Sequence, residues 1–117
     1  MHQIFLRQPA LPDQCDGLSS QAKAFIAGAW ALTRDLEFSE TTALAPKTKA
    51  LISLAVAAQI PCQYCIWADT NGAKAAGATD EEIAEAVGMA AHTRHWSTIF
   101  NGLQIDFEQF KAEMASN

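Results

Sequence analysis

The chain has 117 residues, half of them apolar, and a formal net charge of −5. This length predicts one domain, residues 1–117, that gains stability by associating with further copies. An acidic surface has no basic patch to neutralise phosphates, which argues against nucleic acid and against anionic membranes as partners. Because no apolar run reaches the length of a signal peptide or a membrane span, we expect a cytosolic protein.

The first part of the chain predicts an irregular arm followed by an amphipathic helix. Residues 1–17 contain two prolines and a glycine and are expected to form the arm. Ser19 fits the N-cap of a helix, and apolar side chains then recur at helical spacing, so a helix is predicted at about residues 19–35. Residues 37–45 are expected to form a loop.

The second predicted helix is apolar on all sides. Pro46 suits its first turn, and the residues from Leu51 to Ile60 include almost no polar side chain. A helix without a polar face must be covered on every side. A chain this short cannot supply that cover alone, so we expect this helix to be central and close to a subunit interface.

The rest of the chain also predicts helices. A third helix carries a pair of cysteines and ends near Gly77, and Thr79 with Glu82 forms a capping box for a fourth. A further helix is expected at about residues 96–104, and Asp106 can cap a last one. Since no useful segment alternates with period two, the fold is predicted to be all-α, with about six helices and the cysteine pair at the start of the third.

Cys62 and Cys65 carry the clearest chemical signal. Residues three apart at a helix start approach closely enough for a disulfide, and the free N–H groups there stabilise a thiolate. The pattern leaves three interpretations open: a redox-active dithiol, a metal site, or two small buried side chains. A cytosolic setting favours redox or metal chemistry over a structural disulfide. Cys15, in the arm, is expected to be a free thiol without a role.

Asp69 and His95 are the candidate proton-transfer residues. On a helix, Cys62, Cys65 and Asp69 lie within about one sixth of the circumference. An inward-facing carboxylate is costly without a partner, which favours a functional Asp69 over a solvated one. His95 falls at the border of the buried face of the fourth helix, where it is either a proton relay or a partly buried histidine packed by Trp96.

A zinc site would combine the cysteine pair with two histidines. His92 and His95 are spaced more closely than the histidines of finger-type sites, and His92 is predicted to face solvent. The metal interpretation is therefore disfavoured, and we expect neither a metal nor an organic cofactor.

From Pro46 to about Val87, the run PKTKALISLAVAAQIPCQYCIWADTNGAKAAGATDEEIAEAV resembles the AhpD-like alkylhydroperoxidase/carboxymuconolactone decarboxylase family. The resemblance implies a small all-α protein that assembles as a homotrimer or homohexamer. It also implies that Cys65 attacks a hydroperoxide, that Cys62 resolves the product as a disulfide, and that an external dithiol reduces this disulfide without metal or flavin.

Two positions depart from the peroxidase pattern of that family, which is a glutamate followed by CxxCxxxH. Asp69 stands at the histidine position and Ala50 at the glutamate position. The decarboxylase branch lacks the redox cysteine pair, so this pair argues against lactone decarboxylation. We predict a thiol-dependent peroxidase or disulfide oxidoreductase that uses Cys62, Cys65, Asp69 and His95. The alternatives are a non-catalytic thiol sensor, an oligomeric scaffold or, less favoured, a metal-binding module.

Overall fold

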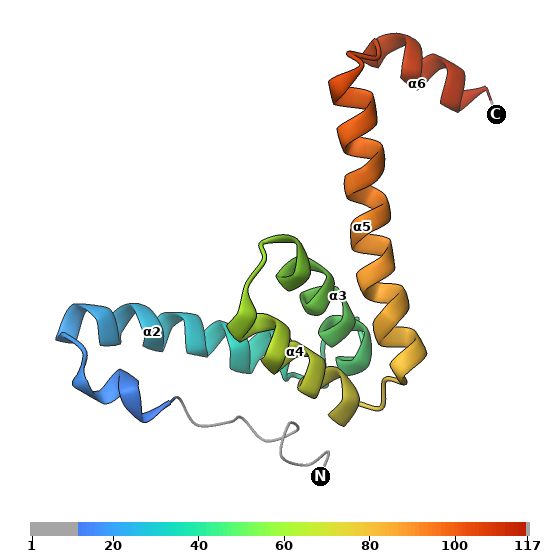
Figure 1. Cartoon of the computed structure of the whole chain (residues 1–117). Helices are drawn as coiled ribbons and strands as arrows, with labels where there is room; N and C mark the ends of the chain where they lie inside the picture. The colour runs from blue at the N-terminus through green and yellow to red at the C-terminus, as the bar shows by residue number, and fades with distance from the viewer. Residues whose placement is uncertain (1–11, 117) are drawn as a thin grey trace.

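The computed structural model describes residues 12–116, and within them every element of secondary structure is a helix. The predicted all-α fold is confirmed, and the cysteine pair lies at the start of α4, the third of the α-helices (Figure 1). Most of the predicted N-terminal arm lies outside the described residues. In chain order the elements are the 3₁₀ helix η1 (Asp13–Gly17), α2 (Ser20–Leu32), the π-helical turn η2 (Thr33–Glu37), α3 (Pro46–Gln59), α4 (Gln63–Ala75), α5 (Asp80–Gly102) and α6 (Phe107–Ala115).

Local sequence sets the helix starts. The Ser19 hydroxyl accepts a backbone N–H from the first turn of α2, and Asp106 does the same for α6. At the start of α5, the Glu82 N–H donates to the Thr79 hydroxyl at 3.1 Å and the Thr79 N–H donates to the Glu82 carboxylate at 2.9 Å. These are the caps predicted from the sequence, and each supplies a partner for an otherwise unpaired N–H group.

The helix expected separately at about residues 96–104 is instead the second half of α5, which runs without a break for 23 residues. The Trp96 ring stacks on Phe100 one turn later, at 5.3 Å between centroids, and its indole N–H donates to His92 one turn earlier, at 3.1 Å. Side-chain contacts at i, i+4 spacing therefore continue through the expected break, and no proline interrupts them.

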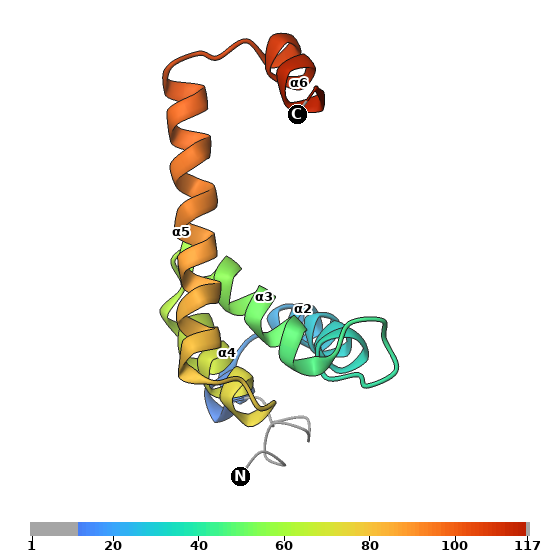
Figure 2. The same cartoon turned by 90° about the vertical axis from the view of Figure 1, so that its right-hand side faces the viewer.

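Helix α3 is central, as its apolar sequence predicts. It packs against α4, α5 and η2 (Figure 2). Among residues 12–116 the buried positions are few, and α3 supplies most of them: Lys49, Leu54 and Ala57 on α3, with Ala73 and Ala78. One stripe of α3, formed by Ile52, Val56 and Ile60, remains 49%, 56% and 64% exposed. The chain thus packs against α3 on one side only and leaves the stripe on the other side uncovered.

The chain is extended. Helices α2 and α5 point away from the centre in different directions, and α6 lies at the far end of α5 (Figures 1 and 2). The Cα radius of gyration is 18.2 Å, against about 13 Å for a compact domain of this length. Large apolar side chains are therefore exposed, including Phe25, Tyr64, Trp67 and Leu103. Exposed apolar surface on this scale marks protein–protein contacts. None of the described helices is long and apolar enough to cross a bilayer.

Candidate active site

Cys62 and Cys65 form a disulfide at the start of α4. The chain enters this helix through the cis Ile60–Pro61 bond, and Cys62 occupies the N-cap with extended backbone angles. The two Cα atoms are 5.3 Å apart, within the usual range for a disulfide. Both residues are half-buried. Cys15 remains a free thiol on η1, as expected.

The two sulfur atoms have different surroundings. Cys62 Sγ accepts the backbone N–H of Cys65 at 3.1 Å, which is the capping bond of α4. A hydrogen-bond donor and a helix N-terminus both favour the thiolate over the thiol, so this bond stabilises negative charge on Cys62 after reduction. Cys65 lies inside the first turn, and Asp69 follows it by one turn on the same side of α4.

Asp69 is half-buried, and its carboxyl group has a perturbed proton affinity. Burial, and after it the negative charge of Glu37, raises the pKa of Asp69 to about 6. An acid with a pKa in this range exchanges its proton near neutral pH, where an ordinary aspartate stays ionised. Such a group is suited to general acid–base chemistry. The functional assignment of Asp69 stays a prediction, and its burial agrees with the inward orientation expected for it.

Glu37 is a site residue that the sequence analysis missed. It ends η2, is half-buried, and has its pKa raised by that burial, with the charge of Lys49 acting in the opposite direction. The sequence placed Glu37 at the start of the loop at 37–45, where no local pattern connects it with Asp69. The available signal was slight: a carboxylate directly before Phe38, at the end of an apolar helix.

Lys49 holds the segment that carries Glu37. The Lys49 side chain is 8% exposed, and its ammonium group donates to the carbonyl oxygens of Leu36 at 2.6 Å and Ser39 at 2.7 Å, and to the Thr42 hydroxyl. Two of these acceptors flank Glu37 in the chain. A buried ammonium group is tolerated when all its donors are used, and here it joins α3 to η2 and the following loop.

The comparison with known proteins agrees with this geometry. Residues 23–106 match the Carboxymuconolactone decarboxylase family. The chain belongs to this family. It is 40% identical over 78 residues to "Uncharacterized protein 4 in cox locus" from Paracoccus denitrificans, an alignment that covers 67% of this chain and 69% of the relative. No solved structure matches the chain. The family inferred from the sequence resemblance is thus confirmed.

The remaining predicted site residue, His95, lies on the second half of α5. It is exposed, and its ring makes an edge contact with Trp96 at 5.4 Å between centroids. This half of α5 extends away from the centre of the fold (Figures 1 and 2). Within residues 12–116 no hydrogen bond or ion pair joins His95 to Cys62, Cys65 or Asp69. The relay role of His95 stays a prediction.

The Cys–His metal set is not assembled in the part of the chain that the structure describes. No cluster of three or more histidine, cysteine, aspartate or glutamate side chains there has a geometry that holds a metal ion. His92 is exposed and accepts the hydrogen bond from Trp96. The exposure of His92 is as predicted.

An open groove of about 440 Å³ runs between α3 and α5. Across it, the Arg94 guanidinium donates to the Gln59 side-chain oxygen at 2.7 Å, and the Gln59 amide donates to the Ala90 carbonyl at 2.8 Å. The groove is mostly apolar and includes Val56 from the exposed stripe of α3. It therefore extends the uncovered apolar surface of α3 onto α5.

Proposed function

We propose that this member of the Carboxymuconolactone decarboxylase family is a thiol-dependent peroxidase. It reduces hydroperoxides with the Cys62–Cys65 pair and is itself reduced by an external dithiol. One observation carries the proposal: the two cysteines are joined at the first turn of α4, with a proton-exchanging carboxyl group, Asp69, one turn further along. Redox-active dithiols are found at helix starts in this arrangement.

The cycle starts from the disulfide. The external dithiol reduces it and becomes a disulfide, and Cys62 and Cys65 regain their thiols. The Cys65 thiolate then attacks a peroxide oxygen, so that an S–O bond forms, the O–O bond breaks, and the leaving alkoxide takes a proton to become an alcohol. The Cys62 thiolate attacks the sulfur of the Cys65 sulfenic acid, which restores the disulfide and releases water once a proton is supplied.

The surroundings of the two sulfurs support this division of roles. The N–H that Cys62 Sγ accepts stabilises the thiolate that must attack the sulfenic acid. Asp69, near Cys65, takes the proton from the Cys65 thiol and returns it to the leaving oxygen. General acid–base assistance of this kind contributes roughly a hundred- to ten-thousandfold in rate.

A thiol redox sensor is the second candidate, because this chain lacks two residues of the family's peroxidase pattern. The glutamate and histidine of the peroxidase pattern are Ala50 and Asp69 here. A chain that kept the cysteine pair without an effective relay would still oxidise, but too slowly to consume hydroperoxide in repeated cycles. Turnover therefore separates the two candidates.

Assembly into a homotrimer or homohexamer accompanies the proposed function. Its support is the uncovered stripe Ile52, Val56 and Ile60, the adjoining groove on α5, and the extended shape of the single chain. Further copies would bury this apolar surface, which a lone chain leaves in water at a cost of about 25 cal/mol for each Å².

The test is peroxide consumption with excess dithiothreitol as the reductant. Because dithiothreitol restores the thiols after each cycle, a peroxidase consumes many equivalents of hydroperoxide per chain above the rate of dithiothreitol alone, whereas a sensor that oxidises slowly adds little to that rate. Cys65→Ser should abolish consumption, and Cys15→Ser should leave it unchanged. A native thiol count before and after peroxide should show the loss of two thiols per chain, from Cys62 and Cys65. Loss of the two thiols in the count, together with hydroperoxide consumption no faster than with dithiothreitol alone, would contradict the peroxidase proposal.

A further inference from the structure

Helix α6 has an apolar face that its own chain leaves largely uncovered. Phe107, Phe110 and Met114 recur at helical spacing along this face. Phe107 and Met114 are 66% and 58% exposed. In the described chain this face meets α5 where the Phe110 ring lies 5.3 Å from the Phe100 ring between centroids. We propose that the apolar face of α6 packs on the exposed stripe of α3, and on the adjoining groove, of a second copy of this chain. This contact depends on the assembly proposed above and identifies the surfaces that meet in it.

The end of α5 holds α6 away from the groove of its own chain. Gln104, just after the helix, has a φ of 55°, in the left-handed region. Its N–H donates to the Asn101 carbonyl oxygen at 3.2 Å, and the Ile105 N–H donates to the Phe100 carbonyl oxygen at 3.0 Å. These two bonds form a Schellman motif, which ends α5 with a defined turn. Figure 1 shows α6 beyond this turn, on the side of α5 away from α3, so the groove is open to a helix of another copy.

The exposed stripe of α3 matches α6 in length and in the spacing of its side chains. From Ile52 to Ile60 the stripe spans about 12 Å, and the nine residues of α6 span about 13 Å, at the rise of an α-helix. The stripe is a row of side chains four residues apart, and Phe107 and Phe110 on α6 are three apart. Rows of these two kinds interlock when helices pack. The stripe ends at Ile60, two residues before Cys62, so the docked helix lies along the segment that leads to the cysteine pair.

The two surfaces also carry opposite charges. Arg94 is the charged residue among those that line the groove, and α3 has no acidic residue. Arg94 donates to the Gln59 side chain, and no carboxylate of residues 12–116 pairs with it. Helix α6 and its cap Asp106 together carry three acidic residues and one lysine, and this lysine, Lys111, pairs with Glu108 at 3.0 Å. An acidic α6 therefore suits the groove, and complementary charge favours this partner over others.

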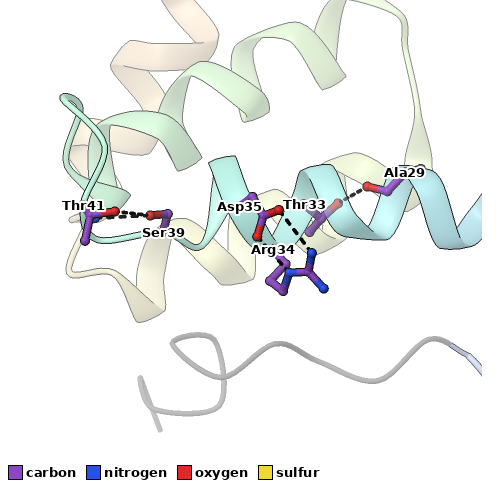
Figure 3. Close-up of polar contacts among 6 residues, drawn as sticks. All are labelled: Ala29, Thr33, Arg34, Asp35, Ser39 and Thr41. Atoms are coloured by element: carbon purple, nitrogen blue, oxygen red, sulfur yellow. Dashed lines mark hydrogen bonds and ion pairs between the residues drawn. The ribbon is translucent and has the colours of Figure 1, made fainter.

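Helix α2 also exposes apolar side chains, and it fits the groove less well than α6. Its residues include Lys23 and no acidic side chain, so it offers no partner for the positive charge of the groove. The first acidic residue after α2, Asp35 on η2, already pairs with Arg34 at 2.8 Å (Figure 3). The same figure shows the Thr33 hydroxyl donating to the Ala29 carbonyl oxygen at 3.1 Å, which ties η2 to the end of α2. Helix α6 is therefore the segment of a second copy that the groove fits.

The experiment compares the self-association of full-length variants by analytical ultracentrifugation. Phe107→Glu places a charge on the apolar face of α6, at the first helical position, where a carboxylate is compatible with the helix. It should weaken self-association about tenfold or more, because the contact loses a large apolar side chain. Ala112→Glu is the matched control. It adds the same charge to the same helix, but Ala112 is exposed and lies on the face opposite Phe107. It should change self-association by about twofold at most.

Mixing two variants tests which surfaces meet. Val56→Glu damages the stripe and Phe107→Glu damages α6, so a mixed pair keeps one undamaged contact, between α6 of the first variant and the stripe of the second. An equimolar mixture should therefore associate more tightly than either variant alone. Wild-type association in Phe107→Glu, an equal loss in Ala112→Glu, or a mixture no stronger than its components would overturn the docking of α6. Self-association of the wild type would then still support assembly through other surfaces, whereas a wild type that remains a single chain would refute both.

Discussion

Replacing Asp69 with asparagine should stabilise the oxidised protein, and only above the pH at which an unfolded aspartate ionises. The pKa of Asp69 rises from 3.8 to about 6 on folding, so the folded state holds the proton more tightly than the unfolded chain. Stability associated with Asp69 is therefore fully present below about pH 4 and is lost as the pH rises through about 6. Above that pH the folded protein carries a disfavoured charge.

The size of the effect follows from the shift. A rise of this extent corresponds to about 3 kcal/mol for a fully enclosed group, at about 1.36 kcal/mol per pH unit. Asp69 is only half-buried, and screening by water reduces the expected gain of Asp69→Asn to about 1–2 kcal/mol at pH 7–8. The amide has nearly the same shape as the carboxyl group, so the packing should be preserved.

The assay is urea unfolding of the oxidised wild type and variant from pH 4 to pH 8, at one fixed chain concentration because self-association adds to stability. The two unfolding free energies should coincide near pH 4 and separate as the pH rises, with the variant more stable. Asp16→Asn, at an exposed position on η1, serves as the control and should show no such separation. A difference that is constant with pH, or a wild type that gains stability relative to the variant at high pH, would refute the reasoning.

Three further predictions concern the fold and the assembly. Val56→Glu places a charge in the exposed stripe of α3 and should weaken self-association about a hundredfold or more, as measured by analytical ultracentrifugation, while the helical circular dichroism of the chain is retained. Lys49→Met leaves three acceptors around η2 without their donor and should lower the free energy of unfolding by about 3 kcal/mol. Lys47→Met, which removes only the exposed ion pair with Glu82, should cost at most about 1 kcal/mol in the same denaturation assay. Thr79→Ala removes the cap of α5 and should cost about 1 kcal/mol, seen as a lower unfolding temperature.

The features that the sequence predicted are those controlled by neighbouring residues. Ser19, Thr79 and Asp106 cap helices because a side-chain oxygen three residues from an unpaired N–H can accept it wherever the helix lies in the fold. The helical stripe of Cys62, Cys65 and Asp69 follows in the same way from the spacing of the chain. The continuity of α5 through Trp96 did not follow, because contacts one turn to either side outweigh the weak helix preference of the residues in between.

No local sequence pattern identifies Glu37 as a residue near the candidate site. Its position depends on an extra residue in η2, on the burial of Lys49 and on the packing of η2 and α4 about α3. The contacts of Lys49 with Leu36 and Ser39 join stretches separated by 10 residues or more. Sequence reasoning identified the carboxylate that shares a helix with the cysteines and missed Glu37, whose charge acts on Asp69 from η2.

Glu37 and a protonated His95 would move the pKa of Asp69 in opposite directions. A protonated His95 beside Asp69 would favour the carboxylate and lower the pKa of Asp69, because opposite charges stabilise each other. Glu37 is an anion and raises the pKa of Asp69, which adds to the larger effect of burial. If assembly brought a protonated His95 of another copy next to Asp69, the pKa of Asp69 would fall, and it would rise again in His95→Gln. A midpoint near 6 that falls in Glu37→Gln and does not change in His95→Gln would identify Glu37 as the charge that acts on Asp69.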